Sequence, residues 1–82
     1  MSKETVREGQ WIYVGENRIP AYVINVISEE EVSAGYYQND VKAIKENFVL
    51  VDDRWEFKHK GPNGTYLKGT RYETIVKRGP YY

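Results

Sequence analysis

Tyrosine and tryptophan side chains are the groups with which this chain could most readily recognise a ligand. Eight of the 82 residues are tyrosines and two are tryptophans. A half-buried tyrosine has an apolar ring and a wet hydroxyl, so one residue type can complete a core or form part of a recognition surface. Exposed rings could stack on a proline-rich peptide or on unpaired bases. The candidates for such an aromatic surface are Tyr13, Tyr36, Tyr37, Trp55 and Tyr66.

These aromatic residues cannot all be exposed, because a domain this small needs about half or more of its aromatic rings for its core. Tyr36 and Tyr37 are adjacent in sequence. In a strand their rings point to opposite faces of the sheet, so we expect one in the core and the other on the surface.

Basic side chains alternate with aromatic ones in the second half of the chain. Residues 1–53 contain five Lys/Arg and ten Asp/Glu, whereas residues 54–82 contain seven and two. Such asymmetry is typical of a basic face that meets an acidic partner, or of two halves that neutralise each other on folding. The overall charge of zero and the isoelectric point of 6.6 argue against a dedicated nucleic-acid binder, whose value usually exceeds about 9. The candidate basic patch is Arg54, Lys58, Lys60, Lys68 and Arg71.

The chain has few side chains that are suited to catalysis or to metal binding. The chain has no cysteine, and His59 is its single histidine. This composition excludes a Cys-His pair and a multi-histidine metal site. His59 is expected to be a solvent-facing residue of a basic segment. Adjacent carboxylates at residues 29–31 and 52–53 could attract a hard cation but are expected to be solvated turns. We therefore expect a protein without enzymatic activity, metal or cofactor.

The chain has no segment suited to a membrane. Its first eight residues are mostly polar or charged, and its apolar runs extend over only a few residues. A membrane-spanning helix needs about 20 apolar residues. We expect a cytoplasmic protein with one domain over residues 1–82.

Short apolar runs bounded by turn residues predict five or six antiparallel strands. The second run is apolar on both faces, which is typical of a central strand. In a regular strand Val26 would lie on the same face as Tyr22 and Ile24. Gly35 is expected to bulge or bend the third strand, and residues 29–31 to form an acidic turn before it. The expected strands span residues 11–14, 19–27, 32–38, 41–51, 54–60 and 65–68.

One of these segments leaves an alternative. Asn39 or Asp40 could cap a short helix after residue 41, although we favour a strand throughout residues 41–51. The run Gly61-Pro62-Asn63-Gly64 is the strongest turn signal in the chain, because proline presets φ and Asn-Gly tolerates the positive φ that follows. It predicts a hairpin between residues 54–60 and 65–68.

The C-terminal segment carries helix signals. Thr70 and Glu73 have the spacing of a capping box, in which two side chains bond reciprocally to backbone N–H groups. Tyr72, Ile75 and Val76 fall on one helical face, and Gly79-Pro80 provides a stop. These features predict a short helix over residues 70–79, with a closing strand over residues 72–77 as the alternative.

Two segments resemble a known family. Glu8-Gly9-Gln10-Trp11-Ile12-Tyr13-Val14, followed by Ile19-Pro20-Ala21-Tyr22-Val23-Ile24-Asn25-Val26, is similar to the opening strands of SH3-like barrels of the Tudor and KOW kind. The resemblance covers about the first third of the chain, and the Asp-Gly-x-Trp-Tyr-Arg stretch of Tudor domains is missing. It implies a small antiparallel barrel and carries over neither a methyl-lysine cage nor a ribosomal partner.

Fold class and composition together favour binding over catalysis. We expect a mainly β, SH3-like barrel of five to six strands that acts as an interaction module for a protein or peptide partner through its aromatic surface. A nucleic-acid-binding barrel that uses the basic second half is one alternative. A structural subunit, which packs its exposed aromatics and its C-terminal tail on a copy of itself or on a larger assembly, is another.

Overall fold

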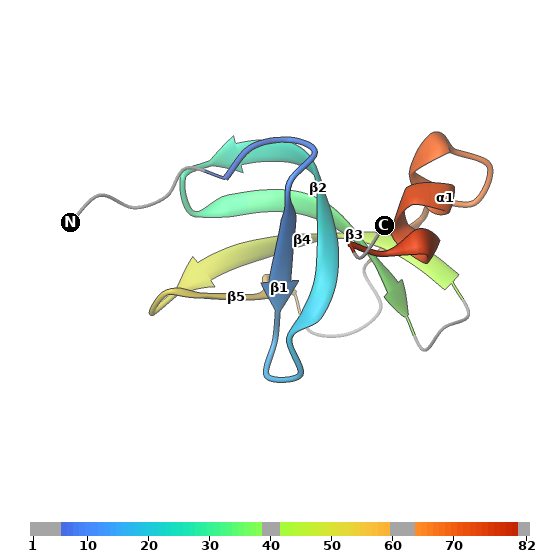
Figure 1. The fold of residues 1–82 in the computed structure, drawn as a ribbon. Coiled ribbons are helices and arrows are strands. Elements are labelled where there is room, and N and C mark those ends of the chain that lie inside the picture. The colour runs from blue at the N-terminus through green and yellow to red at the C-terminus, as the bar shows by residue number, and fades with distance from the viewer. Residues whose placement is uncertain (1–5, 39–41, 60–63, 81–82) are drawn as a thin grey trace.

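The chain folds into a small β-barrel with a helix packed on its outside (Figure 1). The computed structural model describes residues 6–38, 42–59 and 64–80. The predicted fold class, mainly β with a short C-terminal helix, is confirmed, and the segment after residue 41 is a strand. The elements are β1 (Trp11–Val14), β2 (Ile19–Ser28), β3 (Glu31–Gln38), β4 (Lys42–Val51), β5 (Arg54–Phe57), β6 (Thr65–Tyr66) and α1 (Arg71–Arg78).

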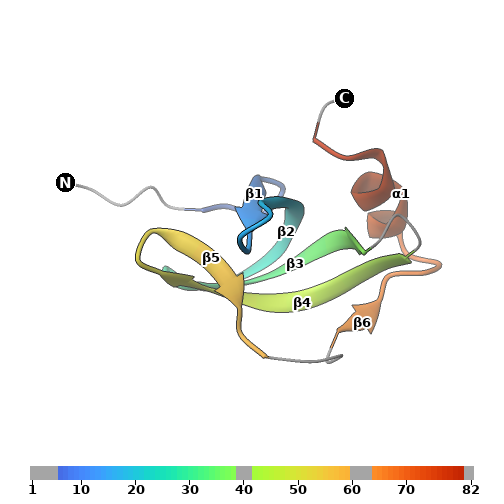
Figure 2. The ribbon, with the colours of Figure 1, turned by 90° about the horizontal axis from the view of Figure 1, so that it is seen from below.

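Five of the strands close the barrel. Each of β1 to β4 pairs antiparallel with the next strand along the chain. A meander of five strands reverses its direction four times, an even number, so its first and last strands run in the same direction. Accordingly β1 and β5 pair parallel, with Val14 opposite Trp55. The short strand β6 is added on β4 (Figure 2).

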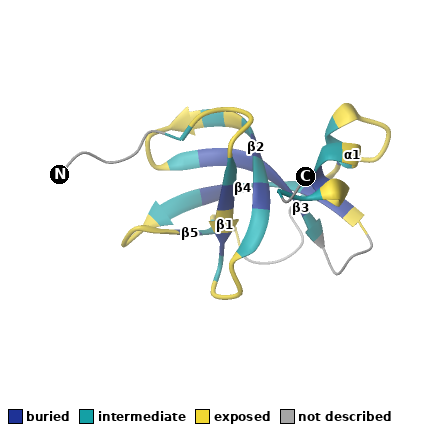
Figure 3. Ribbon diagram, in the orientation of Figure 1, coloured by how far each residue is buried: buried dark blue, intermediate teal, exposed yellow. Residues whose placement is uncertain are grey.

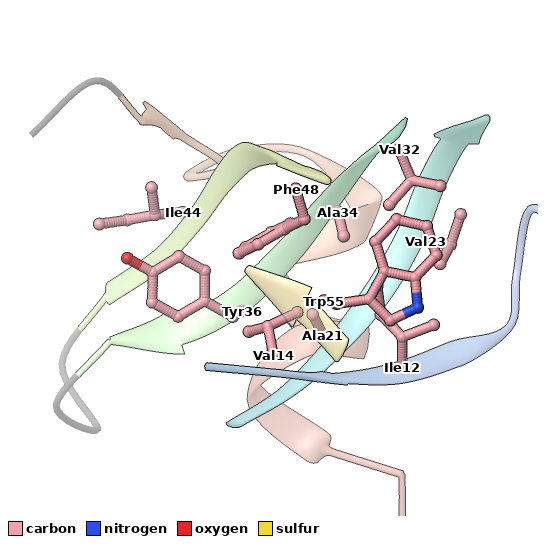
Figure 4. Close-up of a cluster of buried hydrophobic side chains, with 10 residues drawn as sticks. All are labelled: Ile12, Val14, Ala21, Val23, Val32, Ala34, Tyr36, Ile44, Phe48 and Trp55. Atoms are coloured by element: carbon pink, nitrogen blue, oxygen red, sulfur yellow. The ribbon is translucent and has the colours of Figure 1, made fainter. Parts of the chain in front are cut away.

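The barrel interior holds the main core (Figures 3 and 4). Alternation along β1 turns Ile12 and Val14 inward and leaves Tyr13 outside, as the period of two requires. Phe48 is the largest fully buried side chain, and its ring meets that of Phe57 edge-on at 4.8 Å between centroids. The core residues are Ile12, Val14, Ala21, Val23, Val32, Ala34, Tyr36, Ile44, Phe48 and Trp55.

A second apolar cluster lies between α1 and the outside of the barrel. Ala43, Leu67 and Val76 are buried there, and Tyr22 and Ile24 pack against them. The prediction that the second strand is apolar on both faces is confirmed, because its inner residues join the barrel core while these two meet the helix.

The predicted faces of this strand are wrong beyond residue 24. The register between β2 and β3 shifts between Val23 and Asn25. One extra residue in a strand reverses the facing of those that follow. Val26 therefore packs against the barrel core and not on the face of Tyr22.

Gly35 does not bulge its strand; it pairs in register with Tyr22 and with Lys45. Glycine is suited to this position because a side chain would have no room there. A Cβ at this position would stand 2.7 Å from Leu67 Cδ1 and 2.9 Å from Val76 Cγ2. The glycine thus lets the α1 segment approach the sheet closely.

The predicted hairpin between residues 54–60 and 65–68 is wrong. β6 pairs with β4, Ile44 opposite Tyr66 and Lys45 opposite Thr65, and not with β5. β5 pairs only with the last part of the ten-residue strand β4. The edge of β4 near Ile44 is therefore free to pair with a second strand. Residues 61–63 of the predicted turn lie outside the described residues, as do Asn39 and Asp40.

The predicted C-terminal helix is confirmed, but its predicted capping box does not form. The Thr70 hydroxyl donates to the Leu67 carbonyl oxygen at 2.7 Å, and no side-chain cap bond forms at the helix start. Glu73 instead accepts a hydrogen bond from the Gly69 N–H at 3.3 Å. The helix ends at Arg78, and Gly79, whose φ is +84°, caps its C-terminus.

A polar network joins the two oppositely charged halves of the chain. Residues 29–31 do not all form the predicted turn, because Glu31 is the first residue of β3. Its carboxylate accepts hydrogen bonds from Lys58 Nζ at 2.7 Å and Asn47 Nδ2 at 3.2 Å. Asn47 Oδ1 in turn accepts from Ser33 Oγ at 2.8 Å. The hydrogen bond from Lys58 is the main cause that lowers the pKa of Glu31 below its ordinary value of 4.5.

This lowered pKa predicts a stability that weakens in acid. A carboxyl whose pKa is lower in the folded than in the unfolded state stabilises the fold above about pH 4.5, and that contribution disappears as the pH falls through the folded pKa. Glu31→Gln should lower the free energy of unfolding at neutral pH and flatten its decline below pH 4.5. Urea unfolding over a pH series measures both effects. Glu16→Gln, an exposed change in the β1–β2 turn, controls for the loss of one charge; equal profiles for the two variants would contradict the prediction.

Candidate binding site

A surface hollow of about 320 Å³ lies where α1, β4 and β6 meet. Its volume is at the lower end of the range of ligand pockets. We call it the α1–β4–β6 hollow. Its lining residues are Lys42, Ala43, Tyr66, Lys68, Glu73 and Lys77.

Three elements position these side chains. Ala43 lies at the start of β4, is buried against the second cluster, and accepts the backbone N–H of Leu67 at 3.0 Å. This hydrogen bond continues the β4–β6 pairing and brings Tyr66 to one side of the hollow. Glu73 and Lys77 are one helical turn apart on α1, so they share a face of the helix.

Tyr66 is the exposed aromatic residue of the hollow. Its side chain is 61% exposed. Lys42 Nζ donates to the Tyr66 hydroxyl at 3.1 Å and lies 5.1 Å from the ring centroid. A cation at this distance is attracted to the ring face. The two contacts restrict the rotation of the ring, while much of its surface stays accessible to a ligand.

The hollow carries a positive charge. Three ammonium groups and one carboxylate line it, which gives a net charge of +2. Lys77 Nζ lies 3.3 Å from Glu73 Oε2, whereas Lys68 makes no ion pair within the part of the chain that the structure describes. The hydrogen bond from the Gly69 N–H, followed by that from Lys77, lowers the pKa of Glu73. The arrangement suits an anionic ligand with a part that can pack on an aromatic ring.

Two of the five predicted aromatic surface residues are core residues. Tyr36 is 4% exposed and Trp55 is 9% exposed. The Tyr36 ring packs edge-on against Phe57 inside the barrel, and its hydroxyl donates to Glu46 Oε2 at 2.9 Å. Trp55 is enclosed because its side chain belongs to the barrel core, on a strand that pairs with β1 on one side and β4 on the other. Burial removes both from any recognition surface.

The other three predicted aromatics do not form one surface. Tyr13 is 45% exposed on β1, a strand that pairs with neither β4 nor β6. Tyr37 lies opposite Ala43 and is half-buried in the second cluster. Tyr66 alone of the three lines the hollow. The expectation that one of Tyr36 and Tyr37 lies in the core is confirmed by Tyr36, but the other ring is not exposed as predicted, because Tyr37 packs against the second cluster.

The predicted basic patch is divided between two ends of the molecule (Figures 1 and 2). On and after β5, Arg54 pairs with Glu56 at 3.2 Å and Lys58 with Glu31. At the start of α1, the Arg71 guanidinium lies 5.1 Å from the centroid of the Tyr72 ring. Of the four basic residues that the structure describes, only Lys68 lines the hollow; Lys60 lies outside the described residues.

The predicted aromatic surface and basic patch left out four residues of the hollow, the apolar Ala43 and the charged Lys42, Glu73 and Lys77. Glu73 and Lys77 had a usable signal, the i,i+4 spacing of opposite charges on a predicted helix. Lys42 had none, because it reaches the site only through the pairing of β4 with β6, where a different partner was expected.

Other candidate chemistry gains no geometric support. No group of three acidic, histidine or cysteine residues within residues 6–38, 42–59 and 64–80 could hold a metal ion. Asp52 and Asp53 form the β4–β5 turn, with φ of +50° and +66°. His59 lines a separate hollow of about 280 Å³ beside Asn47 and Thr65. No helix among these residues has the length and apolar character needed to cross a membrane.

Comparison of the chain with known protein families, curated proteins and solved structures finds no match. The geometry of the hollow is therefore the basis on which a function can be inferred.

Proposed function

We propose that this domain is a non-enzymatic interaction module, built on an SH3-like barrel, that binds an acidic segment of a protein partner at the α1–β4–β6 hollow. The observation that carries the proposal is the net positive hollow beside an exposed tyrosine, in a chain whose overall charge is zero. The barrel and the second cluster supply a rigid support for this surface.

Protein interfaces commonly combine an aromatic anchor with charged residues at the rim, and the hollow contains both kinds of residue. Tyrosine is enriched among the residues that contribute most to binding, because it offers a large contact area with few rotatable bonds. Tyr66 would serve as this anchor. Lysines at the rim mainly steer an oppositely charged partner and set its orientation. Lys68 is placed for that role, since it has no ion pair within the described residues.

The distribution of basic residues favours an acidic peptide over a nucleic acid. A domain that binds single strands needs a positive groove that follows several successive phosphates, combined with stacking platforms. Here the basic side chains of β5 and those near α1 lie at different ends of the molecule, and Arg54 and Lys58 are paired with carboxylates. A compact charged hollow is better matched to one short acidic stretch.

Replacement of Tyr66 by serine should weaken binding of a labelled acidic peptide about tenfold. Loss of an interface tyrosine of this kind commonly costs more than about 1 kcal/mol, and a tenfold change corresponds to about 1.4 kcal/mol. Fluorescence anisotropy at low ionic strength measures the affinity. Tyr13→Ser, the same change at an exposed tyrosine on β1, is the matched control and should bind like the wild type.

Two outcomes would contradict the proposal. Equal losses for the Tyr66 and Tyr13 variants would place binding elsewhere. Tighter binding of a single-stranded oligonucleotide than of the acidic peptide, with retention on heparin until high salt, would support the nucleic-acid alternative.

A further inference from the structure

One carboxylate interrupts the positive charge of the hollow. Glu73 Oε1 accepts the Gly69 N–H at 3.3 Å, and Glu73 Oε2 lies 3.3 Å from Lys77 Nζ. Lys77 on α1 lines the hollow, and Gly69 directly follows Lys68, another lining residue, on the segment that leads into the helix. A single side chain thus binds a backbone N–H and an ammonium group at the same time.

These two donors are the kind that an external anion would use. Oxyanions are bound in proteins by backbone N–H groups together with lysine or arginine side chains. Lys68 lies nearby, and its positive charge also helps to lower the pKa of Glu73. The Glu73 carboxylate is therefore ionised at neutral pH and occupies the position that the anionic group of a ligand would take.

We propose that Glu73 is an internal ligand of the hollow, and that a phosphate monoester on a protein partner displaces it. This inference rests on the proposed function and names the acidic group that the hollow selects. Glu73 is freed by rotation of its side chain toward solvent, and the phosphate takes over the contacts to Gly69 and Lys77.

Competition with Glu73 is the reason that a phosphate is preferred to a carboxylate. A group tethered within the same helix competes at a high effective concentration, in the millimolar range for short flexible links. A ligand carboxylate would only take the place of the Glu73 carboxylate, so the exchange would contribute little to the free energy of binding. A phosphate monoester carries a charge of about −1.5 to −2 and three strong acceptor oxygens. It can contact Lys68 in addition to the two donors that Glu73 already uses.

Three peptides that differ only in one residue, phosphoserine, aspartate or serine, test this selection on the whole chain. The wild type should bind the phosphoserine peptide more tightly than the aspartate peptide, and the serine peptide least. It should also bind the phosphoserine peptide more tightly than inorganic phosphate, because Tyr66 adds contacts to the peptide. Equal affinities for phosphoserine and aspartate, or for peptide and inorganic phosphate, would overturn the assignment of the ligand.

Glu73→Gln tests the displacement. Removing an exposed ion pair that competes with the ligand should tighten phosphoserine-peptide binding about two- to fivefold. Glu56→Gln is the matched control, because Glu56 forms a comparable ion pair with Arg54 at 3.2 Å on β5, and it should leave the affinity unchanged. If Glu73→Gln bound the phosphoserine peptide no more tightly than the wild type does, the displacement would be overturned. The proposed function would still stand, because the wild type would still bind the peptide. Binding of none of the peptides to any variant would overturn both.

The Gly69 amide provides a readout that needs no variant. In a nitrogen-15 correlation spectrum of the wild type, the phosphoserine peptide should shift the Gly69 resonance, because its hydrogen-bond acceptor changes from Glu73 to the ligand. Binding of the peptide with no shift at Gly69 would show that Glu73 stays in place.

Discussion

Phe48→Ala is expected to lower the free energy of unfolding by about 3–5 kcal/mol, as is usual when a buried phenylalanine is truncated. Phe48 is the largest fully buried side chain, and its ring meets those of Phe57 at 4.8 Å and Tyr36 at 6.1 Å between centroids. A domain of this length has a total stability of about 4–12 kcal/mol. The variant should therefore lose a large fraction of the total stability of the domain.

Urea unfolding followed by circular dichroism measures this loss. Phe57→Ala is the matched control, since it removes the same atoms from a neighbouring but only half-buried ring. Its cost should be clearly smaller, because solvent already reaches that side chain. A Phe48 variant that loses no more stability than the Phe57 variant would show that the barrel interior is not the main core.

Gly35→Ala is expected to cost about 1–3 kcal/mol and to abolish most binding at the α1–β4–β6 hollow. Overpacking a close-packed site usually costs about this much. The new methyl group would press on Val76 Cγ2, which belongs to a β-branched side chain with little rotational freedom, and on Leu67 Cδ1. Leu67 Cδ1 is the end of a flexible side chain, but the contact with Val76 is relieved by moving α1 away from the sheet, which moves Glu73 and Lys77 with it. Urea unfolding and the acidic-peptide assay measure the two effects.

A double-mutant cycle with Val76→Ala separates this clash from a general effect on the strand. Removing Cγ2 makes room for the new methyl group, so the double variant should lose less stability than the sum of the two single losses. Peptide binding should recover in part. Strict additivity of the losses would contradict the close approach of α1 at Gly35.

The architecture explains why binding depends on this approach. The barrel has its own core, and α1 adds the second cluster on the outside. The site lies between them, with Lys42 and Tyr66 contributed by the β4–β6 pair and Glu73 and Lys77 by the helix. Changes in the barrel core are therefore expected to act on stability, and changes under the helix on stability and binding together.

Local patterns were sufficient to predict most elements. Alternation of apolar residues indicated β1, β2 and β3, and the run ending at Val51 indicated β4. The helix was predicted because its apolar face and its Gly79 stop are local features. The predicted capping box is wrong because the N–H and the hydroxyl of Thr70 both donate to the Leu67 carbonyl oxygen, and Glu73 binds the Gly69 N–H.

The amino-acid sequence by itself determined that this chain forms a small, mainly β domain with a C-terminal helix, because strand and helix periodicities depend on neighbouring residues. Only the tertiary structure decided which aromatics are buried and where a ligand could bind. Tyr36 and Tyr66 both belong to short β-forming runs, yet closure of the barrel buries the first and addition of β6 to β4 exposes the second. The physical reason is that pairing partners far apart in the chain, and not local preference, decide which face of a strand meets the core.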